Sequence, residues 1–451
     1  MSKTPENASL LETVVKRAES RGATTADAVA VDVVEGSVRV RLGDVEELTR
    51  SRERQLGLRV FVGQRQAISA TSDLRPEALD DFIDRVVAMA RLTAEDPHAG
   101  LPDPALTGAS HVSAAGLADP EAQSFDMERA VAWCKAAETA AMADPRIKNS
   151  EGGSFGFSHA SRAYCASGGV AGSYSTSNFS GSVVPIAEQN GAMERDYWWT
   201  SRRFLNQLDS PEAVGQKALA RTLRRLDARR LPTGERPVVF DPLTAGSLLR
   251  YLASAINGYS IYRGASFLRG KLGELIASPL VTVVDDATLP GALGSRPYDA
   301  EGLASRRTAI VSSGRLETWL MDTYAARKLG LASTGSAVRS VADAPTVGTS
   351  NLHLLAGTTD PDALLDGIAD GFYVTELIGF GVNVTTGDFS QGAAGLRIKD
   401  GKLDHAVNEV TIAGNLLTML GDVEGVGSDL DTNRTLSAPS LRLRAMMVAG
   451  E

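Results

Sequence analysis

The sequence has 451 residues, 43% hydrophobic and 22% charged, and no apolar run reaches the ~18 residues that a membrane span requires. Its formal net charge is −9, and no block of Lys and Arg interrupts the acidic balance, which argues against direct nucleic-acid binding. Charged residues interrupt the apolar residues near the N-terminus, so we expect no signal peptide and no membrane partner. The two cysteines, Cys134 and Cys165, form no Cys-x-x-Cys pair, so we expect a cytoplasmic protein with reduced thiols.

The first 95 residues predict helix, antiparallel strands and helix. Residues 8–20 have a helical apolar period, and Pro76 opens a second helix. Between them, alternation predicts strands, with a hairpin turn at Glu35-Gly36-Ser37 and another at Gly63-Gln64. The predicted strands are 28–34, 38–42, 56–62 and 66–70.

The next segment continues the N-terminal domain. Residues 95–125 predict a connecting loop, 127–142 a helix, and 149–200 several strands with tight turns. A last helix begins at Ser210-Pro211. The charged and Pro/Gly-punctuated segment 229–234 predicts the boundary between domains 1–230 and 231–451.

The C-terminal half predicts mainly strands after a helix over 243–256. Asp400-Gly401 is a strong type I′ hairpin signal. We therefore predict an α+β protein with an N-terminal helix and antiparallel-sheet domain and a C-terminal strand-rich antiparallel, barrel-like domain. The predicted C-terminal strands are 237–240, 280–284, 308–311, 352–355, 373–377, 382–386, 396–398 and 407–412.

Histidine spacing argues against a zinc site on a helix. No two histidines lie three to five residues apart and none is followed by Glu, so the chain lacks HExxH and HExxxH. We interpret all five as ordinary surface or core residues: His98, His111, His159, His353 and His405.

Two short motifs resemble catalytic or nucleotide-binding sites. Gly152–Gly156 matches GxSxG around Ser154, but strands are predicted on both sides, so we favour a Gly-rich turn over a nucleophile elbow. Gly264–Leu272 nearly matches a P-loop, with one residue too many and Leu272 in place of Ser or Thr.

Several polar and aromatic groups leave alternatives open. Asp285-Asp286, with Asp299 and Glu301 beyond, suits acid–base or metal chemistry, although a strand end before a polar turn is favoured. The aromatic run 197–199 suits a ligand platform, although packing of a sheet or an interface is favoured.

The segment 385–395 combines small residues with polar ones. Such a segment is typical either of a sheet edge that accepts an extended peptide or of a Gly-rich bulge within a sheet, and the pattern favours neither. The peptide-binding candidates are Gly387, Asp388, Phe389, Ser390 and Gly392.

Long ordered motifs in the C-terminal half resemble the TldD/TldE (PmbA) family of metalloproteases, whose members were once described as modulators of DNA gyrase. The N-terminal half fits in outline through 57–60 and 72–74. The resemblance rests on 266–268, 277–286, 294–302, 323–330, 333–335, 375–379, 387–395 and 411–415.

This family has two branches that pair as a heterodimer, and the chain resembles the TldE branch. The TldD branch carries HExxxH, whose positions here hold Leu249, Arg250 and Ser254, and it uses a late Cys that this chain lacks. The resemblance therefore implies a chain without a metal ligand set or catalytic residues of its own. Its partner would be a TldD-like, zinc-bearing subunit, and its substrates unfolded or short peptides.

Two alternatives remain open. The chain could serve as a non-catalytic peptide-binding or regulatory scaffold. It could instead be an independent hydrolase that uses Ser154 or the Asp285/Asp286 pair.

Overall fold

A long, curved antiparallel sheet forms the N-terminal half of the protein. The computed structural model describes residues 4–107 and 116–450. The sheet has the order β3-β2-β1-β4-β5-β6, and β7 also pairs with β5. Its strands are β1 (Thr25–Arg41), β2 (Asp44–Val62), β3 (Arg65–Thr71), β4 (Ile147–Ala166), β5 (Val170–Gln189), β6 (Ala192–Arg195) and β7 (Trp198–Arg202).

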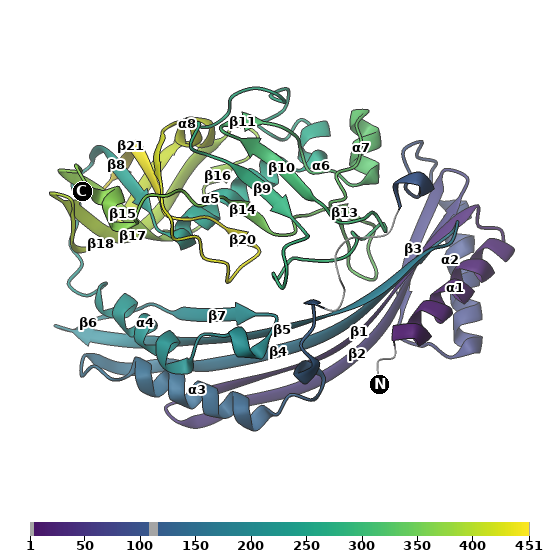
Figure 1. Ribbon diagram of the computed structural model, residues 1–451, viewed down its shortest axis with the longest axis horizontal. Coiled ribbons are helices and arrows are strands. Elements are labelled where there is room, and N and C mark those ends of the chain that lie inside the picture. Colours follow the sequence, from purple (N-terminus) through teal and green to yellow (C-terminus); the bar gives the residue numbers. More distant parts are fainter. Residues whose placement is uncertain (1–3, 108–115, 451) are drawn as a thin grey trace.

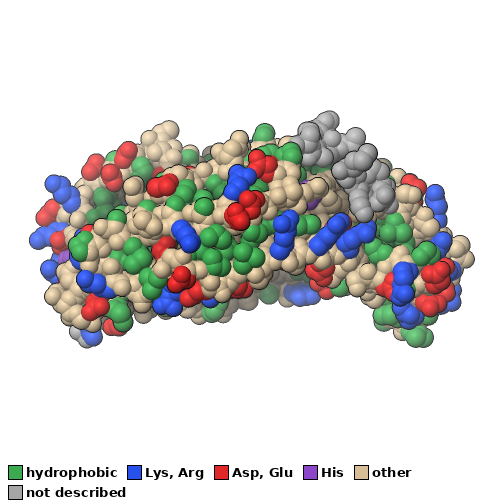
Figure 2. Space-filling model, turned by 90° about the horizontal axis from the view of Figure 1, so that it is seen from below, with side chains coloured by type: hydrophobic (Ala, Val, Ile, Leu, Met, Phe, Trp, Pro, Cys, Tyr) green, Lys and Arg blue, Asp and Glu red, His purple; other side chains and the backbone are tan. Residues whose placement is uncertain are grey.

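Helices cover the convex face of this sheet, and the C-terminal half lies over its concave face (Figure 1). The helices are α1 (Thr4–Ser20), α2 (Pro76–Leu92), α3 (Met127–Ala141) and α4 (Pro211–Leu223). Seen from below, charged side chains of both signs are interspersed with hydrophobic ones (Figure 2).

Strand alternation decides which side chains of β1 meet the helices and which meet the C-terminal half. Ala26, Ala28 and Ala30 pack in one core with α1 and α2. Their odd-numbered neighbours Val29 and Val31 line a cavity shared with C-terminal residues. Successive side chains of a strand point to opposite faces, so one strand serves both layers.

The C-terminal half contains a closed five-stranded barrel. Its strands pair in the order β15-β8-β21-β18-β17, and β17 pairs back to β15. They are β8 (Gly234–Phe240), β15 (Asp370–Ile378), β17 (Asp388–Lys399), β18 (Lys402–Asn415) and β21 (Leu441–Ala449); β16 (Val382–Asn383) and β19 (Val423–Val426) extend the sheet.

A second C-terminal sheet and four helices complete the fold. The sheet has the order β11-β10-β9-β14-β20. Its strands are β9 (Val283–Asp286), β10 (Arg307–Ser312), β11 (Arg315–Leu316), β14 (Leu352–Leu354) and β20 (Leu436–Ser437), with β12 (Ala337–Val338) and β13 (Thr346–Val347) as a separate pair. The helices are α5 (Pro242–Ala255), α6 (Gly258–Tyr262), α7 (Thr323–Leu329) and α8 (Leu416–Gly421).

The predicted α+β class with a barrel-like C-terminal sheet is confirmed. The helix predicted from Pro76 is α2. The turn predicted at Asp400-Gly401 joins β17 to β18, and both residues have the positive φ of a type I′ turn, 49° and 75°. We retain 1–230 and 231–451 as our proposed division into domains.

The hairpin turn predicted at Glu35-Gly36-Ser37 is wrong. These residues lie inside β1, and the chain reverses at Leu42-Gly43 instead. Gly36 serves packing, because a Cβ at this position would lie 2.5 Å from the Phe157 ring. The charged first half of β2 was missed because its exposed side chains show no apolar alternation.

Three C-terminal strands are shorter than predicted, and the one predicted over 352–355 differs least, because β14 ends at Leu354. The strand predicted over 280–284 begins only at Val283. The strand predicted over 382–386 ends at Asn383, whose side chain accepts a hydrogen bond from Thr385 N at 3.0 Å and whose carbonyl accepts one from Gly387 N at 2.7 Å. An Asn that bonds the backbone two residues ahead is typical of a turn and ends the strand. Among the described residues, no helix has the length and hydrophobicity needed to cross a bilayer.

Candidate functional site

A polar cleft separates the concave face of the large sheet from the C-terminal half. It consists of two adjoining cavities of about 360 Å³ and about 480 Å³. Both are lined by Thr176 and Arg203 from the N-terminal half and by Leu293 and Thr435 from the C-terminal half. Ligand sites commonly lie in clefts of this size between domains.

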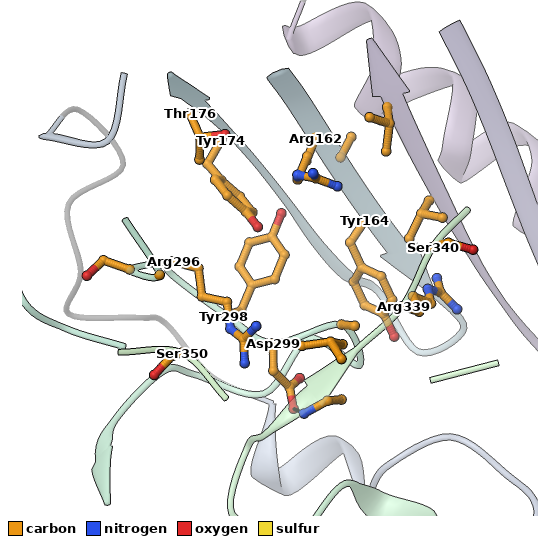
Figure 3. A pocket seen from close by; sticks show the side chains of 18 of the residues that line it. Arg162, Tyr164, Tyr174, Thr176, Arg296, Tyr298, Asp299, Arg339, Ser340 and Ser350 are labelled. Carbon is orange, nitrogen blue, oxygen red and sulfur yellow. Dashed lines mark hydrogen bonds between the residues drawn. The ribbon is translucent and has the colours of Figure 1, made fainter. Parts of the chain in front are cut away.

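Three tyrosines shape the first cavity (Figure 3). The Tyr298 ring lies between Tyr174, at 5.3 Å and nearly perpendicular, and Tyr164, at 6.3 Å. Gly172 makes room for it, because a Cβ there would fall 2.5 Å from the Tyr298 ring. The Tyr298 hydroxyl is buried without a hydrogen-bond partner, and burial raises its pKa. The ring therefore packs the two halves together and leaves one polar group unsatisfied.

Asp299 also lines the first cavity, and its carboxylate organises the adjacent loop. It accepts hydrogen bonds from the backbone amides of Glu301 at 2.9 Å, Leu303 at 3.0 Å and Ala337 at 3.0 Å. Burial and the nearby Glu301 carboxylate raise the pKa of Asp299 to about 6. These bonds are those of a structural carboxylate that holds the loop.

Among the described residues, three arginines and no acidic residue line the second cavity. Arg203 is buried and donates to five backbone carbonyls, including those of Ala292 and Leu293 at 2.7 Å. The Arg434 guanidinium lies 5.1 Å above the Trp199 ring. Arg250 lines the same cavity from α5. Arginines from both halves of the protein thus place positive charge around the second cavity.

A buried ion network joins the two halves beside the cleft. Asp27 of β1 accepts hydrogen bonds from Arg59 at 2.5 Å and from Arg339 at 2.8 Å. Glu301 lies 3.8 Å from Arg59, and Tyr164 donates to the Glu301 carbonyl at 3.1 Å. Burial favours the neutral form of Asp27, but the Arg339 and Arg59 charges outweigh it, so its pKa lies below the ordinary value.

The residues at the positions where the resemblance places HExxxH lie on α5, and their chemistry does not fit a zinc ion. Leu249 is buried in the apolar core. Arg250 is cationic, and the Ser254 hydroxyl donates to the Arg250 carbonyl at 3.2 Å. An aliphatic group, a guanidinium and a hydroxyl engaged in this way do not provide zinc ligands.

The described histidines lie on separate elements. His159 lies on β4, His353 on β14 and His405 on β18, while His98 lies in a turn after α2. His111 lies outside the described residues. Burial lowers the pKa of both His159 and His353. Across residues 4–107 and 116–450, no three His, Cys, Asp or Glu side chains gather in a way that could hold a metal ion.

The predicted peptide-binding segment lies inside the barrel sheet. Asp388, Phe389 and Gly392 pair with β18 on one side and with β15 or β16 on the other, and Ser390 N donates to the Gly381 carbonyl at 2.7 Å. The backbone here is paired on both sides, so the free edge considered for this segment is absent. The side chains of Asp388 and Ser390 are exposed, Gly387 and Phe389 are buried, and their contact with a peptide stays a prediction.

The turn predicted for Gly152–Gly156 is wrong, and the elbow geometry is absent too. Ser154 lies within β4, paired with Arg39 and with Ser182. Gly152 has φ +103° at an irregularity of the same strand. A serine in mid-strand lacks the strand–turn–helix geometry of a nucleophile elbow.

The adjacent carboxylates at 285 and 286 are the last residues of β9 and bind neighbouring loops. Asp285 accepts from Ser350 N at 2.8 Å, and Asp286 accepts from Thr288 N at 2.8 Å. Burial raises the pKa of Asp285. Neighbouring residues of a strand face opposite sides, so the two carboxylates do not form an acid–base pair.

The aromatic run 197–199 packs as the favoured interpretation predicted. Trp198 and Trp199 lie 5.2 Å apart, and Lys217 lies 3.9 Å from the Trp198 ring. Sequence reasoning noticed Arg250 only as a residue at a zinc-motif position, and it missed Arg203 and Arg434, which belong to no motif and lie far apart in the chain. A pattern read along the chain contains no signal for such a convergence.

The three domain models of one family match most of the chain. They are described as PmbA/TldA metallopeptidase domain 1, central domain and C-terminal domain, and they match residues 26–90, 120–226 and 233–450.

Relatives and solved structures cover nearly the whole chain. The Metalloprotease PmbA of Escherichia coli O157:H7 is 37% identical over 94% of this chain and 92% of its own length, and the Metalloprotease PmbA homolog of Haemophilus influenzae is 34% identical over the same shares. A putative modulator of DNA gyrase from Bacteroides thetaiotaomicron superposes with TM-score 0.92, 30% identity and complete coverage of both chains. TldE from Thermococcus kodakarensis has the same fold, with TM-score 0.90 over 98% of this chain and all of its own, at 20% identity.

Proposed function

The chain belongs to the PmbA/TldD metalloprotease family, and we propose that it is a member of the TldE/PmbA branch and the zinc-free subunit of a heterodimeric peptidase. In this proposal a TldD-like subunit supplies the zinc, and this chain holds unfolded or short peptides in the shared chamber. The alternative is a scaffold that binds peptides and regulates another protein.

The observation that carries the proposal is the residue set on α5. By the resemblance, Leu249, Arg250 and Ser254 stand at the positions of the family's zinc motif, and Arg250 lines a cleft that carries polar groups from both halves. A chain that retains the cleft but lacks metal ligands suits a substrate-holding role. We therefore derive no hydrolytic step from this chain's own residues.

An exposed aromatic residue supports the pairing with another subunit. Phe380 is fully exposed, and Ile378 beside it is 49% exposed. Their loop contacts the barrel strand β17, because the Gln391 amide donates to the Gly379 carbonyl at 2.8 Å. Exposed aromatic side chains of this kind often anchor protein interfaces. We propose that this loop contacts the TldD-like partner.

The cysteines support a cytoplasmic location for the complex. Cys134 and Cys165 are both buried and free, and burial raises the pKa of the Cys134 thiol to about 12. Neither thiol is poised to form a disulfide. We propose the reducing cytoplasm as the compartment.

Co-purification with a TldD-type chain tests the proposal. We expect zinc in the partner only, and peptidase activity on an unfolded peptide only after mixing. The variant Phe380→Ser should weaken the complex about tenfold or more if it removes an interface anchor, whereas Leu92→Ser, at an equally apolar and 88% exposed position on α2, should not.

Three outcomes would contradict the proposal or redirect it. Chelator-sensitive cleavage by the isolated chain would overturn the zinc-free role. Peptide binding without activity in any mixture would favour the scaffold. Loss of activity in Ser154→Ala or Asp286→Asn would revive the independent hydrolase, although the positions of both residues lead us to expect no loss.

A further inference from the structure

The arginines of the cleft form a continuous cationic wall in an acidic protein. Arg203, Arg250 and Arg434 line the second cavity, and Arg162, Arg296 and Arg339 line the first. Within the part of the chain that the structure describes, Asp299 is the one acidic residue that lines either cavity, while the whole chain has a formal net charge of −9. The sign of the charge in the cleft is therefore opposite to that of the molecule.

The guanidiniums of the second cavity lack carboxylate partners in the described chain. Arg203 donates only to backbone carbonyls. Arg434 stacks on Trp199, and its Nε is buried without a hydrogen-bond acceptor. Asp431 attracts Arg434 electrostatically but forms no ion pair with it, and Arg250 repels it. Burial also lowers the pKa of Arg203 to about 10, as expected for a desolvated cation without a counterion.

The first cavity repeats this pattern of unsatisfied donors. Arg339 uses one nitrogen for Asp27, and its Nε and second terminal nitrogen are buried without partners. The Nε of Arg296 and the Tyr298 hydroxyl are likewise buried and unpaired. These atoms are closed to the cavity, so they do not themselves contact a ligand, but the guanidiniums that carry them place positive charge in its wall, and this charge favours an anionic ligand.

A carboxylate satisfies these requirements. Its two oxygens match the planar donor fork of a guanidinium, and each charge-assisted hydrogen bond is stronger than a neutral one. The second cavity is also lined by Ser158, Asn178 and Ser201, whose short polar side chains can bond to a peptide backbone. A nucleic acid would need a basic outer surface to approach, and this chain is acidic outside the cleft.

We propose that this cleft binds the carboxylate of a peptide, through Arg250 and Arg434 with Arg203 behind them. The inference rests on the proposed peptide-holding function and adds a substrate class to it, namely peptides that present a free C-terminal carboxylate or an acidic side chain.

Fluorescence anisotropy with the full-length chain tests this inference without any metal. The probes are one short labelled peptide with a free C-terminal carboxylate, the same peptide with a C-terminal amide, and an amidated version with one Glu. We expect the carboxylate and Glu forms to bind about tenfold more tightly than the plain amide, because the amide leaves the guanidiniums without a counterion.

Substitutions of single arginines test which of them distinguishes the carboxylate from the amide. Arg250→Gln should abolish the discrimination between carboxylate and amide, and Arg434→Gln should reduce it. Arg85→Gln is the matched control and should preserve the discrimination, because Arg85 on α2 is exposed and makes no hydrogen bond or ion pair in the described structure. Because Arg250 is exposed and makes no hydrogen bond or ion pair in the described structure, its replacement should leave the melting temperature unchanged.

The outcomes separate this inference from the function on which it rests. Equal binding of carboxylate and amide peptides would overturn carboxylate recognition and leave the peptide-holding role standing. Absence of binding by all three peptides would overturn both. Tighter binding of a single-stranded oligonucleotide, lost in Arg250→Gln, would show that the cleft recognises phosphate and would also overturn the inference.

Discussion

Replacing Asp27 by Asn tests the energetic role of the buried ion network between the two halves. Asp27 is fully buried and accepts from Arg59 Nη2 at 2.5 Å, Arg59 Nε at 3.1 Å and Arg339 Nη1 at 2.8 Å. Asn keeps the shape but removes the charge, so Arg339 loses its ion-pair partner. Breaking one side of a buried pair costs about 3–5 kcal/mol.

Thermal unfolding followed by tryptophan fluorescence and circular dichroism measures this cost. With about 2 °C per kcal/mol in a large domain, the melting temperature should fall by roughly 6–10 °C. Asp144→Asn is the matched control: hydrogen bonds from Arg146 lower the pKa of Asp144 to about 2, but this ion pair is exposed. We expect no measurable shift in the control, because exposed pairs contribute little.

The pH dependence gives an independent check on Asp27. Its folded pKa lies below the ordinary value of 3.8, so its stabilisation is present above pH 3.8 and is lost as the pH falls through the folded pKa. Asp27→Asn should flatten the acid side of the stability curve. A variant that melts within 1–2 °C of the parent, at about the precision of such melts, would refute the reasoning.

Three further predictions address packing and protonation. Gly57→Ala should lower the melting temperature and weaken the contact between β2 and the segment around Val341, because a Cβ there would lie 1.9 Å from the Val341 carbonyl oxygen. In the same thermal melts Gly156→Ala should be tolerated, because the nearest atom to its Cβ would be 3.5 Å away. Leu249→Ala should cost about 2–5 kcal/mol in urea unfolding, since the side chain is buried in the apolar core; a cost below 1 kcal/mol would show that the site is not packed. Burial raises the pKa of Asp322 to about 6, so its contribution to stability should decline as the pH rises from about 4 to about 6, opposite in sign to Asp27; Asp322→Asn should remove that decline, and an unchanged pH profile would contradict it.

Local chemistry made much of the architecture predictable. Pro76 and the apolar period that follows it specify α2, and Asp400-Gly401 specifies a tight hairpin, because these features act through neighbouring residues. The family motifs were equally readable, since they are contiguous. The residue types at 249, 250 and 254, where the resemblance places the zinc motif, could be read directly from the sequence.

Tertiary structure alone decided where the polar groups meet. Glycine at position 36 indicated a turn, but Gly36 lies in β1. A glycine is needed there because Phe157 from β4 occupies the space that a Cβ would need. Arg203 and Arg434 belong to no motif, and only the packing of the C-terminal half over the curved sheet brings them to one cavity with Arg250. Residue type and local period determine secondary structure, whereas a binding site depends on long-range contacts that no local pattern encodes.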